Sequence, residues 1–287
     1  MKIFLSKWAE KGIIESVEDK KTENCHNLPH RAVIKQSSTT KIRPVFDASA
    51  KERNGVSLND CLEKGPNYLE LIPSILNRFR LGKYGVISDI CKAFLQIGVC
   101  LRDRDFLRFL WWEEGDSEKF KIYRHKRVVF GVNGSPFFLA ATLNYHLENV
   151  PEHQQEVAKK LSESMYVDNC VASIDTIEGL NTFINVSKEI MSTAKFDLRG
   201  WCYNEPSNET LKGNPCNKDS DKTVSVLGLK WNLSNDTLSC DFKDSSVKQP
   251  VNKRNILSIV HRIFDSIGFT APATLIPKLM LQECWKQ

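Results

Sequence analysis

The sequence predicts an α+β fold, in which helices pack on antiparallel sheets. Apolar runs on either side of a polar turn indicate β-hairpins, as in residues 106–112 and 120–130. Apolar side chains at helical spacing indicate amphipathic helices, as in residues 177–191. Helices and hairpins mix along the chain and no internal repeat is visible, so a repeat architecture is excluded.

Local patterns justify each further element before residue 204. Residues 68–79 carry apolar side chains at helical spacing and predict a helix, and the apolar run 84–89 predicts a strand. Ser135 and Pro136 predict the start of a helix, with Ser135 as the N-cap and Pro136 at the first position. Residues 165–173 predict a hairpin with a tight turn.

The rest of the chain divides at a polar segment without periodicity. That segment is rich in Asn, Ser, Lys, Pro and Gly, which is typical of a loop. We expect, in order, this loop over residues 204–222, a hairpin formed by residues 224–232 and 237–242, and helices over residues 253–264 and 270–285.

The composition is that of an ordinary globular protein. The chain has 287 residues, a net charge of +5 and 41% hydrophobic residues, which excludes a disordered or collagen-like chain. No apolar run reaches the ~20 residues of a membrane-spanning helix. The nine cysteines include no CxxC pair, so we expect reduced thiols and no zinc site. The mildly basic charge permits nucleic-acid binding without establishing it.

Two carboxylates carry the most informative chemistry. Asp89 ends an apolar strand, and Asp168 lies in the predicted turn Asp168-Asn169 between apolar residues. A carboxylate in such a position is costly unless it is solvated, paired or bound to a cation. Two carboxylates from neighbouring strands can hold a pair of Mg²⁺ ions ~4 Å apart. Two plainer roles stay open at this point: a hairpin turn for Asp168-Asn169, and a helix cap for Asp89.

Five motifs in order resemble those of reverse transcriptases. Tyr-Val-Asp-Asn at residues 166–169 resembles the YVDD-type motif, and Val-Ile-Ser-Asp-Ile at residues 86–90 resembles the first aspartate motif. The other matches are the fingers motif at residues 41–49, the motif before the palm helix at residues 131–137, and the primer-grip hairpin at residues 226–231. Each motif alone is weak, but the ordered set is specific.

Residues 25–287 further resemble the Pao (BEL/Pao) group of LTR retrotransposons. The segments that carry this resemblance include Val-Phe-Asp-Ala-Ser-Ala-Lys at residues 45–51, Ser-Leu-Asn-Asp at 57–60, Phe-Asp-Leu-Arg-Gly-Trp at 196–201 and Phe-Asp-Ser-Ile-Gly-Phe-Thr-Ala-Pro at 264–272. The chain looks like a fragment of a longer polyprotein.

The resemblance implies a right-hand polymerase fold, with a palm of antiparallel sheet plus helices, fingers, and a partial helical thumb. It also implies a division of the chain. The expected segments are an N-terminal extension (1–24), fingers and first palm helix (25–83), palm with an interleaved fingers hairpin (84–203), a polar loop (204–222), a primer-grip-like hairpin (223–243) and a partial thumb or connection (244–287).

The resemblance also implies roles for single residues. Asp89 and Asp168 would be the metal-binding catalytic aspartates, with Asn169 beside them in the same motif. Phe94 would lie under the sugar of the incoming nucleotide as a steric gate. The remaining residues implied to bind are Lys35 and Arg43 on the triphosphate, Tyr166 in the substrate site, and Gly228, Lys253 and Arg254 on the template and primer.

Some positions depart from the family pattern. Asn169 stands where the motif usually has a second aspartate, and this change removes a negative charge. Phe130 stands where many retroviral enzymes have Gln, although the Pao group also tends to lack that Gln. Gly200 and Ser266 stand where the Pao group often has Lys and Pro, and together these positions suggest drift from an active consensus. The alternative is therefore a catalytically impaired retrotransposon remnant that binds nucleic acid at most. An unrelated structural protein would require the ordered motifs to be coincidental.

The implied activity is RNA-directed DNA synthesis, in which a primer 3′-hydroxyl attacks the α-phosphate of a dNTP. The implied cofactor is Mg²⁺, as two ions, with Mn²⁺ as the alternative. The implied partners are an RNA or DNA template with its primer, and dNTP, with no membrane. Protease, RNase H and integrase domains are expected elsewhere in such a polyprotein but absent from this chain. The expected location is the cytoplasm, or a virus-like particle if the element is intact.

Overall fold

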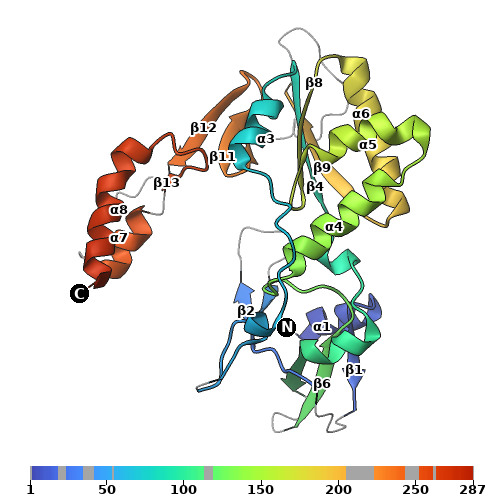
Figure 1. Ribbon diagram of the computed structural model, residues 1–287, viewed down its shortest axis with the longest axis vertical. Helices are drawn as coiled ribbons and strands as arrows, with labels where there is room; N and C mark the ends of the chain where they lie inside the picture. The colour runs from blue at the N-terminus through green and yellow to red at the C-terminus, as the bar shows by residue number, and fades with distance from the viewer. Residues whose placement is uncertain are drawn as a thin grey trace. The chain divides into compact units, whose positions relative to one another are not determined.

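The computed structural model describes residues 2–18, 24–34, 42–53, 55–112, 119–204, 223–242, 252–260 and 263–286. Lys35 and residues 205–222 of the predicted polar loop therefore lie outside the described residues. The chain forms two compact units (Figure 1). The first unit comprises Met1–Leu69, Cys91–Val150 and Ser192–Phe196, and the second comprises Glu70–Ile90, Pro151–Met191 and Asp197–Gln287.

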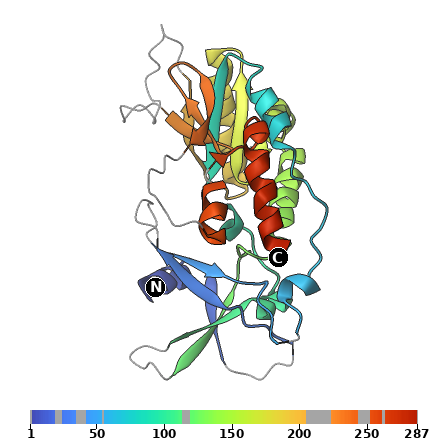
Figure 2. The ribbon, with the colours of Figure 1, turned by 90° about the vertical axis from the view of Figure 1, so that its left-hand side faces the viewer.

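The first unit contains two antiparallel sheets. Strands β1 (Ile14–Val17), β6 (Phe120–His125) and β5 (Arg108–Trp112) form one sheet in the order β1-β6-β5, which confirms the predicted hairpin. Strands β2 (His30–Ile34) and β3 (Ile42–Phe46) form a two-stranded ribbon, drawn in blue in Figure 2. The helices of this unit are α1 (Lys2–Glu10), α2 (Leu58–Cys61), α4 (Ser135–Glu148) and the 3₁₀ helices η1 (Ala93–Gln96) and η2 (Leu101–Leu107).

A fully buried histidine lies in the aromatic core of the first unit. The ring of His125 packs against Phe46, Phe109 and Trp8, with ring centroids 4.5, 5.1 and 5.8 Å away. Neither ring nitrogen has a hydrogen-bond partner among the described residues. Burial, with a smaller contribution from His30, lowers the pKa of His125 to about 3. The imidazole is therefore neutral at physiological pH.

We expect His125 to make the stability of the first unit pH-dependent. Because its pKa is lower in the folded state than in the unfolded chain, the unfolded chain binds the extra proton first. The free energy of unfolding should fall as the pH drops below ~6.5, the ordinary pKa of histidine. Urea denaturation at pH 7.5 and pH 5 measures this loss. His125→Phe should reduce the loss, whereas His153→Gln, at an exposed position, should leave it unchanged. An equal loss in His125→Phe would contradict this account.

The second unit is built on a four-stranded antiparallel sheet in the order β7-β8-β4-β9. Helix α3 (Ile72–Phe79) covers one face, and α5 (Gln155–Ser162) and α6 (Ile177–Thr193) lie on the other (Figure 1). A core of buried side chains joins α3 to strand β8, because Ile75 and Phe79 pack with Val171. The strands are β7 (Met165–Tyr166), β8 (Asn169–Ile174), β4 (Tyr84–Ile90) and β9 (Leu198–Tyr203), and the short 3₁₀ helix η3 (Glu152–Gln154) precedes α5.

A second antiparallel sheet of the same unit packs on this core. Its strands follow the order β10-β11-β12-β13, and Trp231 from β11 enters the core next to Phe79. The strands are β10 (Thr223–Val226), β11 (Leu229–Asn232), β12 (Thr237–Phe242) and β13 (Ile263–Phe264), and the helices are α7 (Lys253–Val260) and α8 (Ala271–Lys286). Among the described residues, no helix is long and apolar enough to cross a membrane.

Several predicted boundaries are wrong: β5 begins at Arg108 instead of residue 106, and β6 ends at His125 instead of residue 130. Other differences have local physical reasons. The helix predicted from residue 68 begins at Ile72, because Leu71 is extended and a proline occupies its first turn. Gly134, not Ser135, caps α4, because the buried Ser135 hydroxyl donates instead to the Val129 carbonyl oxygen at 2.7 Å. The segment 224–232 is two strands, because Leu227 and Gly228 have positive φ and form a turn. The segment 253–264 ends as strand β13.

One cysteine also departs from the prediction. Cys202, at the end of β9, is disulfide-bonded, whereas the sequence favoured reduced thiols throughout. The described cysteines that are free include the buried Cys170 on β8, where burial raises the pKa of the thiol to about 12. That thiol is therefore protonated and unreactive at neutral pH.

Candidate active site

Asp89 lies near the end of β4, between two partner strands. The residues around it are apolar and mostly buried, which fixes β4 at the centre of the sheet. On one side Asp89 pairs with Asn169 of β8, and on the other it pairs with Arg199 of β9. Its side chain remains 50% exposed. Asp89 is thus a strand residue, and the alternative of a helix cap is wrong.

Asp168 lies in the two-residue turn between β7 and β8. The turn consists of Val167 and Asp168, because Tyr166 pairs directly with Asn169. The prediction of Asp168-Asn169 as the turn is therefore displaced by one residue, and Asn169 is the first residue of β8. Val167 has a φ of +57°, which is strained for a β-branched residue. Strain of this kind persists where the surrounding structure holds the backbone in place.

The fold brings the two aspartates together. The backbone N–H of Ile90 donates to the carbonyl oxygen of Asp168 at 2.7 Å, which ties the turn to the end of β4. Burial raises the pKa of Asp168, and the negative charge of Asp89 raises it further. The Asn169 amide donates to Oδ1 of Asp168 at 3.0 Å. Two like charges and one polar amide therefore meet at the edge where β4, β7 and β8 end.

Strand β9 contributes two residues that the sequence reasoning missed. The Arg199 Nε lies 3.8 Å from Oδ2 of Asp89, and both side chains are about half exposed. Gly200 has a φ of +68°, and a Cβ atom at this position would lie 2.7 Å from Oδ1 of Asp89. The sequence had suggested drift at Gly200. Only the pairing of β9 with β4, which no local pattern reveals, places these residues beside Asp89.

The donor set of this site fits a divalent cation. The carboxylates of Asp89 and Asp168 are hard oxygen ligands, and a bound cation would offset the burial and repulsion that raise the pKa of Asp168. The described part of the chain holds no group of three or more His, Cys, Asp or Glu side chains that could bind a metal. The set therefore suits Mg²⁺ or Mn²⁺, which share their shell with water and substrate phosphates, better than structural Zn²⁺.

The other predicted residues of the second unit have the following places. Tyr166 is half-buried in β7 and packs against the core cluster that contains Ile75 and Trp231. Gly228 has a φ of +90° in the turn between β10 and β11. Lys253 and Arg254 are exposed in the first turn of α7, where the Lys253 ammonium lies 5.5 Å from the Trp285 ring centroid.

The predicted residues of the first unit are Phe94, Arg43 and Lys35. Phe94 lies in η1, is only 5% exposed, and packs edge-to-face on Phe130 at a centroid distance of 4.5 Å. The backbone of Arg43 lies in β3 opposite Val33. Of these three residues, Phe94 is the one whose side chain the structure describes. Its ring packs against a second aromatic residue, Phe130.

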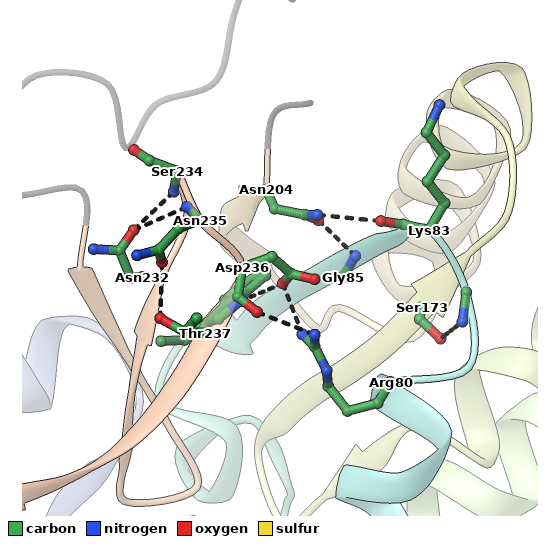
Figure 3. A network of polar contacts seen from close by, with 12 residues as sticks. Arg80, Lys83, Gly85, Ser173, Asn204, Asn232, Ser234, Asn235, Asp236 and Thr237 are labelled. Carbon is green, nitrogen blue, oxygen red and sulfur yellow. Dashed lines mark hydrogen bonds and ion pairs between the residues drawn. The ribbon is translucent and has the colours of Figure 1, made fainter. Parts of the chain in front are cut away.

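Hydrogen bonds and an ion pair anchor the β11–β12 hairpin to the end of α3 (Figure 3). The Arg80 guanidinium donates to Oδ1 and to the carbonyl oxygen of Asp236 at 2.7 and 3.0 Å. The Trp231 indole N–H donates to the same Oδ1 at 2.8 Å. Across the sheet, the Asn204 side chain bonds the backbone of Gly85 and Lys83, which fixes the end of β9 to the start of β4.

Comparisons with known proteins give one family match and several similar structures. Residues 252–287, which include α7, β13 and α8, match the Pao retrotransposon-like RNaseH-like domain family. From the sequence we expect a partial thumb or connection in this segment and no RNase H domain in the chain, and the family match differs from the second expectation. No curated protein sequence matches the chain.

Similar solved structures include foamy viral protease-reverse transcriptases. One, with an RNA/DNA hybrid, has a TM-score of 0.61 at 18% identity and covers 93% of this chain and 30% of that chain. The dRH form, in complex with double-stranded DNA, also has a TM-score of 0.61 at 18% identity, and the match covers 89% of this chain and 38% of that chain. A mutant of the prototype foamy virus protease-reverse transcriptase has a TM-score of 0.51 at 18% identity, and the match covers 69% of this chain and 22% of that chain. The chain thus has a mixed α/β fold like these retroviral proteins and spans well under half of their length.

Proposed function

We propose that this chain is the reverse transcriptase domain of a Pao-type retrotransposon polyprotein, an RNA-directed DNA polymerase. The observation that carries the proposal is the meeting of Asp89, near the end of β4, with Asp168, in the turn that leads into the neighbouring strand β8. Its support includes the ordered motifs, the similarity in fold to protease-reverse transcriptases, and the match of residues 252–287 to a Pao family. In this proposal the sheet β7-β8-β4-β9 with its helices is the palm, and α7 and α8 begin a thumb.

The aspartates would bind two Mg²⁺ ions, or Mn²⁺ in their place. When bound, such a pair activates the primer hydroxyl and stabilises the charge on the leaving pyrophosphate. Asp89 and Asp168 would hold the cations, and the hydrogen bond from the Ile90 N–H to the Asp168 carbonyl oxygen keeps Asp168 at its position. The turn at Gly228 would approach the primer end, where a residue without a side chain leaves room for the nucleic-acid backbone.

The first unit would hold the incoming dNTP. Phe94 would bar a 2′-hydroxyl from beneath the sugar, since its ring is packed against Phe130 and cannot easily move aside. Lys35 and Arg43 would contact the triphosphate. Tyr166, in the second unit, would also take part in binding the substrate. Lys253 and Arg254 would contact phosphates of the template and primer. The location that follows from such a polyprotein is the cytoplasm or a virus-like particle.

A second candidate function rests on Asn169. The amide of Asn169 donates to Asp168 but adds no negative charge, so the site attracts cations less than one with a second aspartate. On this reading the chain is a catalytically impaired remnant that binds nucleic acid at most. The two candidates differ in whether the wild-type chain incorporates dNTPs.

Asn169→Asp tests both candidates in one assay. We expect the wild type to extend a DNA primer on an RNA template, and Asn169→Asp to extend it roughly tenfold faster at limiting Mg²⁺, because the added carboxylate strengthens cation binding. The assay is steady-state primer extension over a range of Mg²⁺ and Mn²⁺ concentrations. A silent wild type with an active Asn169→Asp would favour the impaired remnant.

A further inference from the structure

A β-bulge places two neighbouring residues of β9 against the Asp89 carboxylate. The pairing of β4 with β9 shifts by one residue between Ile87 and Asp89, so that Ile87 pairs with Cys202 but Asp89 pairs with Arg199. Two residues of β9, Gly200 and Trp201, therefore stand opposite one residue of β4. A glycine with positive φ at the first position of a bulge is one of its usual forms.

The bulge sends its residues in different directions. Trp201 is buried, donates its indole N–H to the Leu198 carbonyl oxygen at 3.2 Å, and packs edge-to-face on Phe183 of α6. Arg199, two residues earlier, is 56% exposed and lies at Asp89. The buried Trp201 thus holds the register that keeps Arg199 and Gly200 beside the carboxylate.

The Asp89 carboxylate occupies the space that a side chain at residue 200 would need. A Cβ atom at residue 200 would lie 2.7 Å from Oδ1 of Asp89, and the next nearest atom is Cγ of the same side chain at 3.9 Å. The clash of an added methyl group would therefore fall on the carboxylate alone, which can rotate away. An alanine here would displace the carboxylate, and it would also carry the backbone cost of a positive φ.

Arg199 neutralises part of the charge that a cation would bind. Its Nε lies 3.8 Å from Oδ2 of Asp89, so the guanidinium and a divalent cation would compete for one carboxylate. Both side chains are about half exposed, so the ion pair is weak and a cation can displace it.

We propose that β9 sets the cation affinity of the site, with Gly200 as a positioning residue that keeps Asp89 in place and Arg199 as a built-in competitor for its carboxylate. This inference rests on the proposed function, because it assumes that Asp89 and Asp168 bind a divalent cation. It makes Gly200 a requirement of the site instead of a sign of drift. It also predicts opposite effects at two adjacent residues, which a general loss of structure cannot produce.

Mn²⁺ binding to the full chain, without nucleic acid or dNTP, tests the proposal by electron paramagnetic resonance. We expect Gly200→Ala to weaken binding roughly tenfold, because the carboxylate must leave its position. We expect Arg199→Gln to strengthen binding about two- to fivefold, the scale of an exposed ion pair, and Arg199→Lys to stay close to the wild type. The matched control is Gly268→Ala, which carries the same backbone cost at a φ of +79° but has open space around the added methyl group.

The outcomes separate this inference from the proposed function. If Asp89→Asn abolishes Mn²⁺ binding but neither Gly200→Ala nor Arg199→Gln changes it, only the role of β9 is overturned. Absence of Mn²⁺ binding in the wild type overturns the cation site and this inference together. If circular dichroism shows Gly200→Ala to be unfolded, Gly200→Asn replaces it, because asparagine tolerates positive φ and still carries a Cβ.

Discussion

Asp168→Asn should lower Mg²⁺-dependent primer extension roughly a thousandfold or more. The substitution keeps the shape of the side chain but removes a carboxylate that would bind the cations. Asp89→Asn should have an effect of the same size, because the two side chains meet at one edge of the sheet. Single-turnover incorporation of one dNTP on a primed RNA template measures the loss.

The same substitution should stabilise the cation-free protein. Burial and the charge of Asp89 raise the pKa of Asp168, so its ionised form costs folding free energy at neutral pH. That cost shrinks as the pH falls below the raised pKa and is gone below the ordinary pKa of aspartate, whereas asparagine removes it at any pH. The control is Asp175→Asn, just beyond the far end of β8, which should change neither property. An Asp168→Asn chain that retains most of its activity would contradict the assignment of Asp168 to the catalytic site.

Trp231→Ala should lower the free energy of unfolding of the second unit by about 3–5 kcal/mol, the usual cost of truncating a large buried side chain. Trp231 is fully buried and packs edge-to-face on Phe79 at 4.8 Å. Its indole N–H donates to Asp236, and the close approach of its ring requires a glycine at residue 85. The loss therefore combines a cavity with a broken hydrogen bond.

Urea denaturation followed by circular dichroism measures this change. The matched control is Trp285→Ala in α8, where the tryptophan is 56% exposed and the expected change is within about 0.5 kcal/mol. Equal effects of the two substitutions would show that Trp231 does not anchor the β10–β13 sheet to α3.

The sequence predicts elements well where a local pattern decides them. The β5–β6 hairpin and α6 follow from apolar runs and helical spacing, and both are present. It fails where a backbone angle or a tertiary contact decides. The apolar run 224–232 looks continuous, but a turn at Leu227 and Gly228 divides it. Phe264 belongs to a strand because it pairs with Asp241 of β12, which lies far back in the sequence.

The candidate site is predictable only in part for the same reason. The apolar flanks of Asp89 and Asp168, with the motifs around them, predict that the two meet. The roles of Arg199 and Gly200 depend on a one-residue shift between β4 and β9, and a shift of register leaves no mark on local periodicity. Likewise the strain at Val167 arises because the turn lies one residue earlier than the polar pair Asp168-Asn169 suggests.

Template-directed nucleotide addition by the purified chain tests the proposed polymerase most directly. A DNA primer annealed to an RNA template is incubated with one dNTP at a time, in Mg²⁺ and separately in Mn²⁺. The proposal predicts addition of the complementary dNTP only, and none by Asp89→Asn. Absence of addition by both the wild type and Asn169→Asp, in either cation, would contradict it.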